Sequence, residues 1–327
     1  RALYVNDRFM YKTDVIYTGV QLHEIRDLNP DANEATLNLT IWFRYRGAFN
    51  PADVVFTNAV KPVELGKPYR EERGEVTTYV AYRIEFPGTA GELVAADFNA
   101  DGKDDLAFGG TGRQAAQLLT GGPRFTVAGT LPTSALDDGP LLFFDADGDG
   151  DADLLQTRAG TNRNLNSPEY QPLLHLNHAG SFVPAPDALP PLPSSLGAAV
   201  AADFDRDGKL DLFLGGRVLP GRYPTAPRSA LLRNIGGRFE DVTAGLAAGL
   251  GEVGMVSSAL WSDVDQDGWP DLVLALEWGG VRFWRNLEGR GFEDRSEAAG
   301  FTSAGTGWWT SLASADFNGD GRPDYVA

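Results

Sequence analysis

The sequence predicts an all-β protein assembled from short strands, and three observations support this fold class. A nine-residue pattern occurs five times along the chain, and short apolar runs typical of strands flank each copy. Gly and Pro account for 39 and 20 of the 327 residues, which favours many turns over long helices. Because the pattern starts only at residue 97, we expect a small N-terminal β domain over residues 1–87 and a repeat domain over residues 88–327.

The N-terminal region alternates between apolar and polar residues. Residues 36–46 (TLNLTIWFRYR) and 75–86 (EVTTYVAYRIEF) both alternate, which is typical of half-buried strands. The turn residues NPDAN at 29–33 connect the first of these strands to an earlier apolar segment, residues 14–25. These features predict a β-sandwich-like domain that contains a hairpin.

The repeated pattern reads D-x-[DN]-x-D-G-x-x-D, and its copies span residues 97–105, 145–153, 203–211, 263–271 and 316–324. Side-chain oxygens at positions 1, 3, 5 and 9 converge on one point of a tight turn, where Gly at position 6 permits the bend. The backbone carbonyl at position 7 can add a further oxygen. Hard oxygen ligands in this arrangement select Ca²⁺ over softer metals, so the sequence predicts about five calcium ions.

The predicted ligands follow directly from the pattern. The side-chain ligands are Asp97, Asn99, Asp101, Asp105, Asp145, Asp147, Asp149, Asp153, Asp203, Asp205, Asp207, Asp211, Asp263, Asp265, Asp267, Asp271, Asp316, Asn318, Asp320 and Asp324. The carbonyl ligands are those of Lys103, Asp151, Lys209, Trp269 and Arg322. A single copy is equally compatible with an Asp- and Gly-rich turn without metal, but five copies between apolar strands favour the metal.

The loops differ from helix–loop–helix calcium hands, which need a Glu at position 12. That position holds Phe108, Gln156, Leu214, Leu274 and Ala327. Since the flanking segments are strands, each loop is predicted to be a hairpin turn. The five loops contain 20 of the 45 acidic residues, and five bound Ca²⁺ would bring the net charge from −17 to about −7. Without cations, so many like charges at close range would destabilise the loops.

The third and fourth repeats show how each unit continues beyond its loop. Residues 229–243 and 280–296 both contain an apolar strand that ends in Arg-Asn, then a Gly turn, then a strand that starts at Phe. Each repeat therefore has four strands: one before the loop, one after it, and these two. Four antiparallel strands in about 50–60 residues correspond to one blade of a β-propeller.

These segments resemble a known repeat family. AADFDRDGKLDLFLGG (201–216) and SDVDQDGWPDLVLA (262–275) resemble the FG-GAP/VCBS repeats of integrin α-subunits and of many bacterial surface proteins. Residues 215–234 and 307–327 are similar to the bacterial branch that resembles cartilage acidic protein. The resemblance covers about residues 88–327. It implies a calcium-stabilised β-propeller, extracellular, at the cell surface or periplasmic, that serves adhesion or binding.

The chain departs from the family in the number of blades. Family propellers usually have seven, whereas this sequence contains four full repeats and the first two strands of a fifth. Three arrangements follow: further blades beyond residue 327, closure of the ring by residues 76–86, or strands from a neighbouring subunit. The last would make the chain a building block of a polymer.

The N-terminal hairpin has a weaker resemblance of its own. Residues 18–47 are similar to the first strands of the pentameric ligand-gated channel extracellular domain and its soluble bacterial relatives. The cysteine loop and the membrane helices of that family are missing. No ligand site is carried over from it.

Composition excludes several classes of function. The net charge of −17 repels nucleic acid and anionic membranes, and no apolar run is long enough for a transmembrane helix. The absence of cysteine excludes disulfides and thiolate chemistry. His175 and His178 would lie on opposite faces of a strand, so they do not form a metal pair. Nucleotide-binding, hydrolase and zinc-protease motifs are also missing.

Three functions remain: a calcium-loaded module that binds a protein or a glycan, a structural subunit of a surface assembly such as a filament, and a propeller-scaffold lyase or hydrolase. For the module, the ligand face should lie opposite the calcium loops, where the long connections of the blades gather. Exposed Arg and Tyr side chains there are the best recognition candidates. The candidates are Arg163, Tyr170, Arg217, Arg222 and Tyr223. The alternative is that these connections only cap the core.

Overall fold

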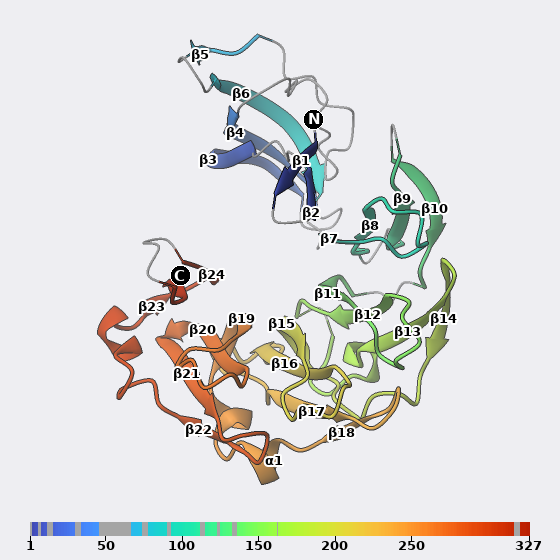
Figure 1. Ribbon diagram of the computed structural model, residues 1–327, viewed down its shortest axis with the longest axis vertical. Helices are drawn as coiled ribbons and strands as arrows, with labels where there is room; N and C mark the ends of the chain where they lie inside the picture. Colours follow the sequence, from blue (N-terminus) through green and yellow to red (C-terminus); the bar gives the residue numbers. More distant parts are fainter. Residues whose placement is uncertain are drawn as a thin grey trace. The chain divides into compact units, whose positions relative to one another are not determined.

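The computed structural model has the all-β fold that the sequence predicts, and its sheets are propeller-like (Figure 1). The structure divides into two compact units, Arg1–Ala90 and Gly91–Ala327. It describes residues 2–5, 8–11, 16–29, 34–45, 67–73, 78–89, 93–111, 115–122, 125–132, 136–161, 163–316 and 321–327, with the backbone alone for 2–45 and 83–89.

The first unit contains a hairpin and a four-stranded antiparallel sheet. The hairpin joins β1 (Ala2–Val5) to β2 (Arg8–Tyr11). The sheet has the order β3-β4-β6-β5, with β3 at Ile16–Asn29, β4 at Glu34–Tyr45, β6 at Thr78–Thr89 and β5 at Arg70–Arg73. The predicted hairpin is confirmed, because β3 and β4 pair along most of their length.

The position of β6 bears on one of the three arrangements at the end of the chain. β6 pairs with β4 along its whole length and with β5 at Thr78–Ala81. Among the described residues it pairs with no strand of the second unit, so the structure does not support closure of the ring by residues 76–86. All twelve residues of β4 find a partner on β6, which explains why the strand belongs to this sheet.

The second unit contains four successive antiparallel meanders, which we call blades 1 to 4. Blade 1 consists of β7 (Leu93–Ala96), β8 (Asp105–Phe108), β9 (Gln117–Thr120) and β10 (Thr126–Thr130). Blade 2 consists of β11 (Asp138–Phe144), β12 (Asp153–Arg158), β13 (Leu173–His178) and β14 (Ser181–Ala185).

The remaining blades repeat this plan. Blade 3 consists of β15 (Ser195–Ala202), β16 (Asp211–Val218), β17 (Ala230–Asn234) and β18 (Phe239–Asp241). Blade 4 consists of β19 (Met255–Ser262), β20 (Asp271–Gly279), β21 (Val281–Asn286) and β22 (Phe292–Asp294). A short strand, β23 (Gly307–Trp308), adds to β20, and β24 (Ala313–Ala315) pairs with β25 (Asp324–Val326).

Helical turns are few and short in the described part of the chain. They are η2 (Pro168–Tyr170), α1 (Thr243–Leu246), η3 (Leu250–Glu252) and η4 (Phe301–Ala304). Each nine-residue loop joins the first strand of its meander to the second, and the Asp at position 9 is the first residue of that second strand. The predicted hairpin turns are therefore confirmed.

The hydrophobic core lies between neighbouring blades. Leu155 of blade 2 and Leu212 of blade 3 belong to one buried cluster, and Phe213 of blade 3 and Leu274 of blade 4 belong to the next. Every residue of β12 is buried, including the polar Asp153, Gln156, Thr157 and Arg158. Each fully buried large apolar side chain contributes about 1.5–3 kcal/mol of stability, so face-to-face packing of the blades supplies the main driving force for the fold.

An asparagine at the end of a third strand ties blade 3 to blade 2. The Asn234 side-chain amide donates to the Ala146 carbonyl of blade 2 at 2.8 Å and to the Leu210 carbonyl of its own blade at 3.0 Å. Its Oδ1 accepts the backbone N–H groups of Gly236 and Gly237. Asn234 is 1% exposed, and its bond to Ala146 of the neighbouring blade is shielded from water.

The same link recurs in the two neighbouring pairs of blades. Asn177 donates to the Phe98 carbonyl at 2.7 Å, and Asn286 donates to the Phe204 carbonyl at 2.9 Å. The accepting carbonyl belongs in every case to position 2 of the preceding blade's loop. The first four loops are thus connected in series at one end of the blades.

We predict that Asn234→Ala lowers the free energy of unfolding by about 2–4 kcal/mol, because two buried carbonyls lose their donor. Ile235→Ala is the matched control, since this neighbouring side chain is 50% exposed. Urea unfolding of both variants checks the prediction. Equal losses in the two would show that the asparagine does not hold the blades together.

A buried polar network crosses the first three strands of blade 2. His175 is fully buried, and its Nε2–H donates to Gln156 Oε1 at 3.0 Å. The Gln156 amide donates to Asp138 Oδ2 at 2.8 Å, and Arg158 forms an ion pair with Asp138. His175 Nδ1 has no hydrogen-bond partner. His178, by contrast, is exposed, so the two histidines lie on opposite faces as predicted.

Burial, and next the nearby Arg158 charge, lower the pKa of His175 to about 4. The pKa of histidine in the unfolded chain is about 6.5, so the unfolded state binds a proton before the folded state does. The contribution of neutral His175 to the free energy of unfolding is therefore complete above pH 6.5 and is lost as the pH falls toward 4.

We predict that His175→Gln, which keeps a donor for Gln156, removes this loss, about 3 kcal/mol at most. Urea unfolding at several pH values between 4 and 7 measures it, and the difference between the variant and the parent isolates His175 from other titrating groups. His178→Gln serves as the control. Parallel stability curves for parent and His175→Gln would contradict the assignment.

Candidate metal centres

The backbone of each loop is shaped by bonds to its first aspartate. In the second loop the Gly150 N–H donates to Asp145 Oδ2 at 3.0 Å, and the first, third, fourth and fifth loops repeat this bond between positions 6 and 1. The glycine at position 6 is left-handed, with φ of 92° at Gly150. Only glycine adopts this conformation without strain, which explains the residue type.

Position 4 of the loops is also left-handed, which the pattern did not reveal. The φ angles are 57° at Ala100, 60° at Arg206 and 61° at Gln266, whereas the second loop has Gly148 there. A non-glycine residue in this region is strained by about 1–3 kcal/mol. The second loop therefore forms its turn with the least strain among the first four.

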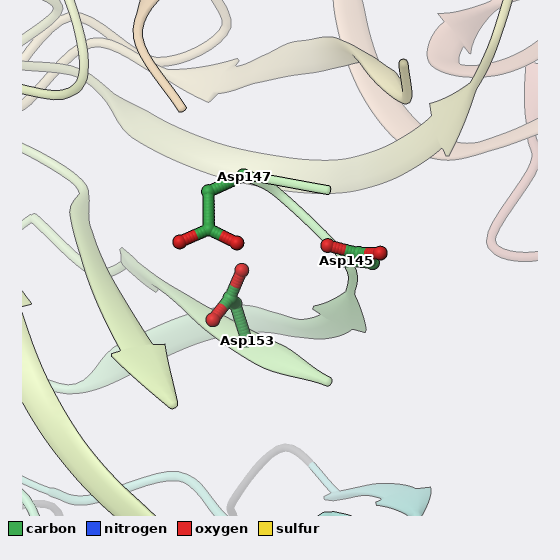
Figure 2. Close-up of side chains that lie close together, drawn as sticks. All are labelled: Asp145, Asp147 and Asp153. Carbon is green, nitrogen blue, oxygen red and sulfur yellow. The ribbon is translucent and has the colours of Figure 1, made fainter. Parts of the chain in front are cut away.

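Three carboxylates meet in each of the middle loops. Figure 2 shows Asp145, Asp147 and Asp153, at positions 1, 3 and 9 of the second loop, directed toward one another. One oxygen of each lies within 4.8 Å of one oxygen of the others. The third and fourth loops make the same cluster with Asp203, Asp205 and Asp211 and with Asp263, Asp265 and Asp271.

The aspartate at position 9 is the fixed member of each cluster. Asp211 is fully buried; its Oδ2 accepts the Phe204 N–H at 3.1 Å and its Oδ1 accepts the Asn234 N–H at 2.8 Å. Asp153 and Asp271 are held by the equivalent pairs of backbone N–H groups. A carboxylate offers about four lone pairs, so each oxygen keeps capacity for a cation.

Burial is the main cause of raised pKa values at position 9. Together with a smaller effect of the other loop carboxylates, it raises the pKa of Asp153 and of Asp271 to about 6 and that of Asp211 to about 7. The two backbone N–H bonds act in the opposite direction. Burial therefore makes the charged form of these carboxylates less stable than that of an exposed aspartate, and a bound cation would offset this cost.

The aspartate at position 5 accepts a hydrogen bond from the backbone N–H at position 7 of its own loop. Asp149 Oδ1 accepts the Asp151 N–H at 2.9 Å, and Asp207 Oδ1 accepts the Lys209 N–H at 2.9 Å. Asp101 and Asp267 make the same bond. Among the described residues, the three-carboxylate clusters contain no position-5 side chain. The predicted roles of position 5 and of the position-7 carbonyls stay predictions.

The loops differ in their positive neighbours. In blade 3, Arg233 Nε lies 2.8 Å from Asp205 Oδ2, and in blade 4 Arg285 pairs with Asp265 and, at 2.9 Å, with Asp267. These arginines belong to the Arg-Asn pair that the repeats share. Blade 2 has Leu176 at that place, so its five loop aspartates lack this counter-charge.

The first and fifth loops form no three-carboxylate cluster among the described residues. In the first loop Asn99 stands at position 3, and its amide lies 3.5 Å from Asp105 Oδ1. In the fifth loop Asn318 and Asp320 lie outside the described residues. Asp316 accepts the Gly321 N–H at 2.9 Å.

The predicted recognition residues separate into two groups. Tyr170 is 1% exposed, and the Arg163 N–H donates to its hydroxyl at 3.3 Å, while Arg163 pairs with Glu169. The expectation that Tyr170 is exposed is therefore wrong. The short turn η2 directs its ring inward, where a large aromatic side chain gains more from burial than from solvent.

The other group gathers at the end of blades 3 and 4 away from the loops. Tyr223 is 54% exposed and its hydroxyl donates to Glu277 Oε1 at 2.6 Å; Arg217 forms an ion pair with the same carboxylate, and Arg222 is exposed. The sequence analysis missed Glu277. Its position in the repeat could have identified it, because Arg217 and Glu277 each follow the position-9 aspartate of their blade by six residues.

The described part of the chain contains no helix that combines the length and the apolar character needed to cross a bilayer. Comparison of the complete sequence with curated proteins gives no significant match. Residues 263–327, which hold the fourth and fifth loops, match the FG-GAP-like repeat family. This segment of the chain is thus similar to an FG-GAP-like repeat, the family that the loop sequences resemble.

Proposed function

We propose that the repeat domain is a calcium-binding β-propeller that acts outside the cytoplasm as an adhesion or binding module for a protein or a glycan. The observation that carries the proposal is the convergence of carboxylates from positions 1, 3 and 9 in three consecutive loops. The match of residues 263–327 adds support, since FG-GAP repeats occur in extracellular adhesion-type proteins.

The donor set fits calcium. All the gathered ligands are carboxylate oxygens, which hard cations prefer, and hairpin loops give the flexible geometry that Ca²⁺ tolerates and Mg²⁺ does not. Asp205 Oδ1 and Asp263 Oδ1 are buried without a hydrogen-bond partner. A buried carboxylate oxygen without a partner is costly, and a bound cation would satisfy both.

The alternative from a different class is a structural subunit of a surface assembly. Ordered polymers of the purified protein would support it, and a monomer at high concentration would support the module. The comparisons indicate no enzyme family, and the FG-GAP repeat is typically non-enzymatic.

We predict that excess chelator lowers the melting temperature clearly. Extracellular calcium sites bind at about 10⁻⁴–10⁻³ M, and one site contributes about 2.7 kcal/mol at a hundredfold excess of calcium over its Kd. Asp147→Asn should reduce this gain by one site, while Asp187→Asn, at an exposed aspartate outside the loops, should not. Scanning calorimetry with and without calcium is the measurement, and a melt indifferent to chelator would refute calcium binding.

We further predict that Arg285→Gln strengthens calcium binding at the fourth loop about fivefold or more. The arginine holds Asp265 and Asp267 and repels an incoming cation, by about 1 kcal/mol at a few ångströms in water. Arg282→Gln is the matched control on the same strand, because Arg282 pairs weakly with Asp294 at 3.9 Å. Calcium titration calorimetry compares the two, and unchanged or weaker binding in Arg285→Gln would count against the competition.

A further inference from the structure

Two tryptophans form an exposed aromatic surface at the end of blade 4 away from its loop. Trp278 is 59% exposed and Trp308 is 61% exposed, yet their rings contact each other, with centroids 5.5 Å apart and a tilt of 33°. Asp271 and Trp278 stand at opposite ends of β20, about 23 Å apart at the rise of an extended strand. This surface is therefore separate from the candidate metal centres.

Trp278 is held in a conformation that its side chain disfavours. Its φ is 57°, in the left-handed region that bulky residues rarely adopt. β23 pairs with β20 through Glu277–Trp308 and Gly279–Gly307, and the register shift between these pairs leaves Trp278 as an unpaired bulge residue. Bulges of this kind redirect a side chain and are enriched beside functional sites. The strained backbone at Trp278 turns its ring outward, so the ring lies in solvent rather than in the core.

Polar groups surround the two rings in a fixed arrangement. Trp278 Nε1–H donates to the Tyr223 hydroxyl, which donates in turn to Glu277 Oε1 at 2.6 Å. The Arg217 guanidinium pairs with the other oxygen of Glu277. The Glu277 side chain is only 4% exposed, so this buried carboxylate orients Tyr223 and Arg217 from beneath.

A cavity of about 550 Å³ adjoins Trp278, within the range of small-ligand sites. Its lining is mostly apolar and includes Pro224, Pro227, Gly251, Met255, Glu277 and Trp278. The aromatic surface therefore continues into a concave site whose lining also contains the charged residues Arg228, Glu252 and Glu277.

The charges around this site favour a neutral ligand. Arg217 pairs with Glu277 and Arg228 pairs with Asp241, which leaves the exposed Arg222 and Glu252 with opposite charges. The described residues around this site therefore offer a cationic peptide no net negative charge, although the chain as a whole carries −17. The aromatic faces of the two tryptophans suit a ligand ring with an apolar face. The fixed hydroxyl, carboxylate and guanidinium groups beside them suit hydroxyls at the edge of that ring.

We propose that this site binds a neutral oligosaccharide. One pyranose ring stacks on Trp278 and Trp308, which removes apolar surface of both partners from water. Its hydroxyls bond to Tyr223 and Arg217, whose positions Glu277 fixes. The proposal rests on the proposed function in one respect, because it names the glycan as the ligand of the binding module.

The test uses the full chain in calcium and titration calorimetry with cellohexaose, xylohexaose, mannohexaose and chitohexaose. Decalysine and decaproline peptides are the competing probes. At least one hexasaccharide should bind, and Trp278→Gly and Trp308→Ala should each weaken it tenfold or more. Trp278→Gly should melt at the parent temperature or higher, because glycine relieves the left-handed strain. Phe125→Ala, which removes another exposed aromatic ring in blade 1, should bind as the parent does.

Absence of binding to all four sugars, equal binding in the tryptophan variants, or peptide binding that needs Trp278 would each overturn the proposal. Melting of the same samples with chelator separates this result from the calcium hypothesis. If calcium stabilises the protein but none of the four sugars binds, the glycan site alone is overturned. Sugar binding by protein that is indifferent to calcium would support the site and contradict the proposed role of the loops.

Discussion

The repeat domain depends on one interaction, the capture of two backbone N–H groups by the buried aspartate at position 9 of each of the first four loops. In blade 3, Asp211 accepts the N–H of Phe204 within its own loop and the N–H of Asn234 from the third strand. This carboxylate closes the loop and aligns three strands at once. It also positions Asn234, whose side chain reaches the neighbouring blade. The candidate metal ligands, the blade edges and the contact between blades therefore share one anchor.

The same anchor explains why the loops suit a cation. Burial raises the pKa of Asp211 to about 7, so the fold alone does not favour the charged carboxylate that the loop needs. In blades 3 and 4 an arginine supplies part of the missing positive charge, and blade 2 lacks it. The repeats are therefore alike in geometry and different in electrostatics. Their affinities for a divalent cation should differ for this reason.

Local spacing revealed the loops, the strands beside them and the glycine at position 6, because hairpin geometry depends on neighbouring residues. It could not reveal that Asp211 bonds to Asn234, since that contact joins residues 23 positions apart. The burial of Tyr170 and the strain at Trp278 were missed for a related reason: both depend on what packs around the side chain. Alternation along residues 76–86 identified a strand but could not identify its partner, which is β4.

The asparagine links all run in one direction along the chain. Asn177 reaches back 79 residues, Asn234 reaches back 88 and Asn286 reaches back 82, each to a carbonyl of the preceding blade. During synthesis, a blade that has just left the ribosome therefore lacks the donor for this carbonyl until the next blade has been made. Each blade completes its predecessor, so the maturation of the domain lags behind translation by about one repeat.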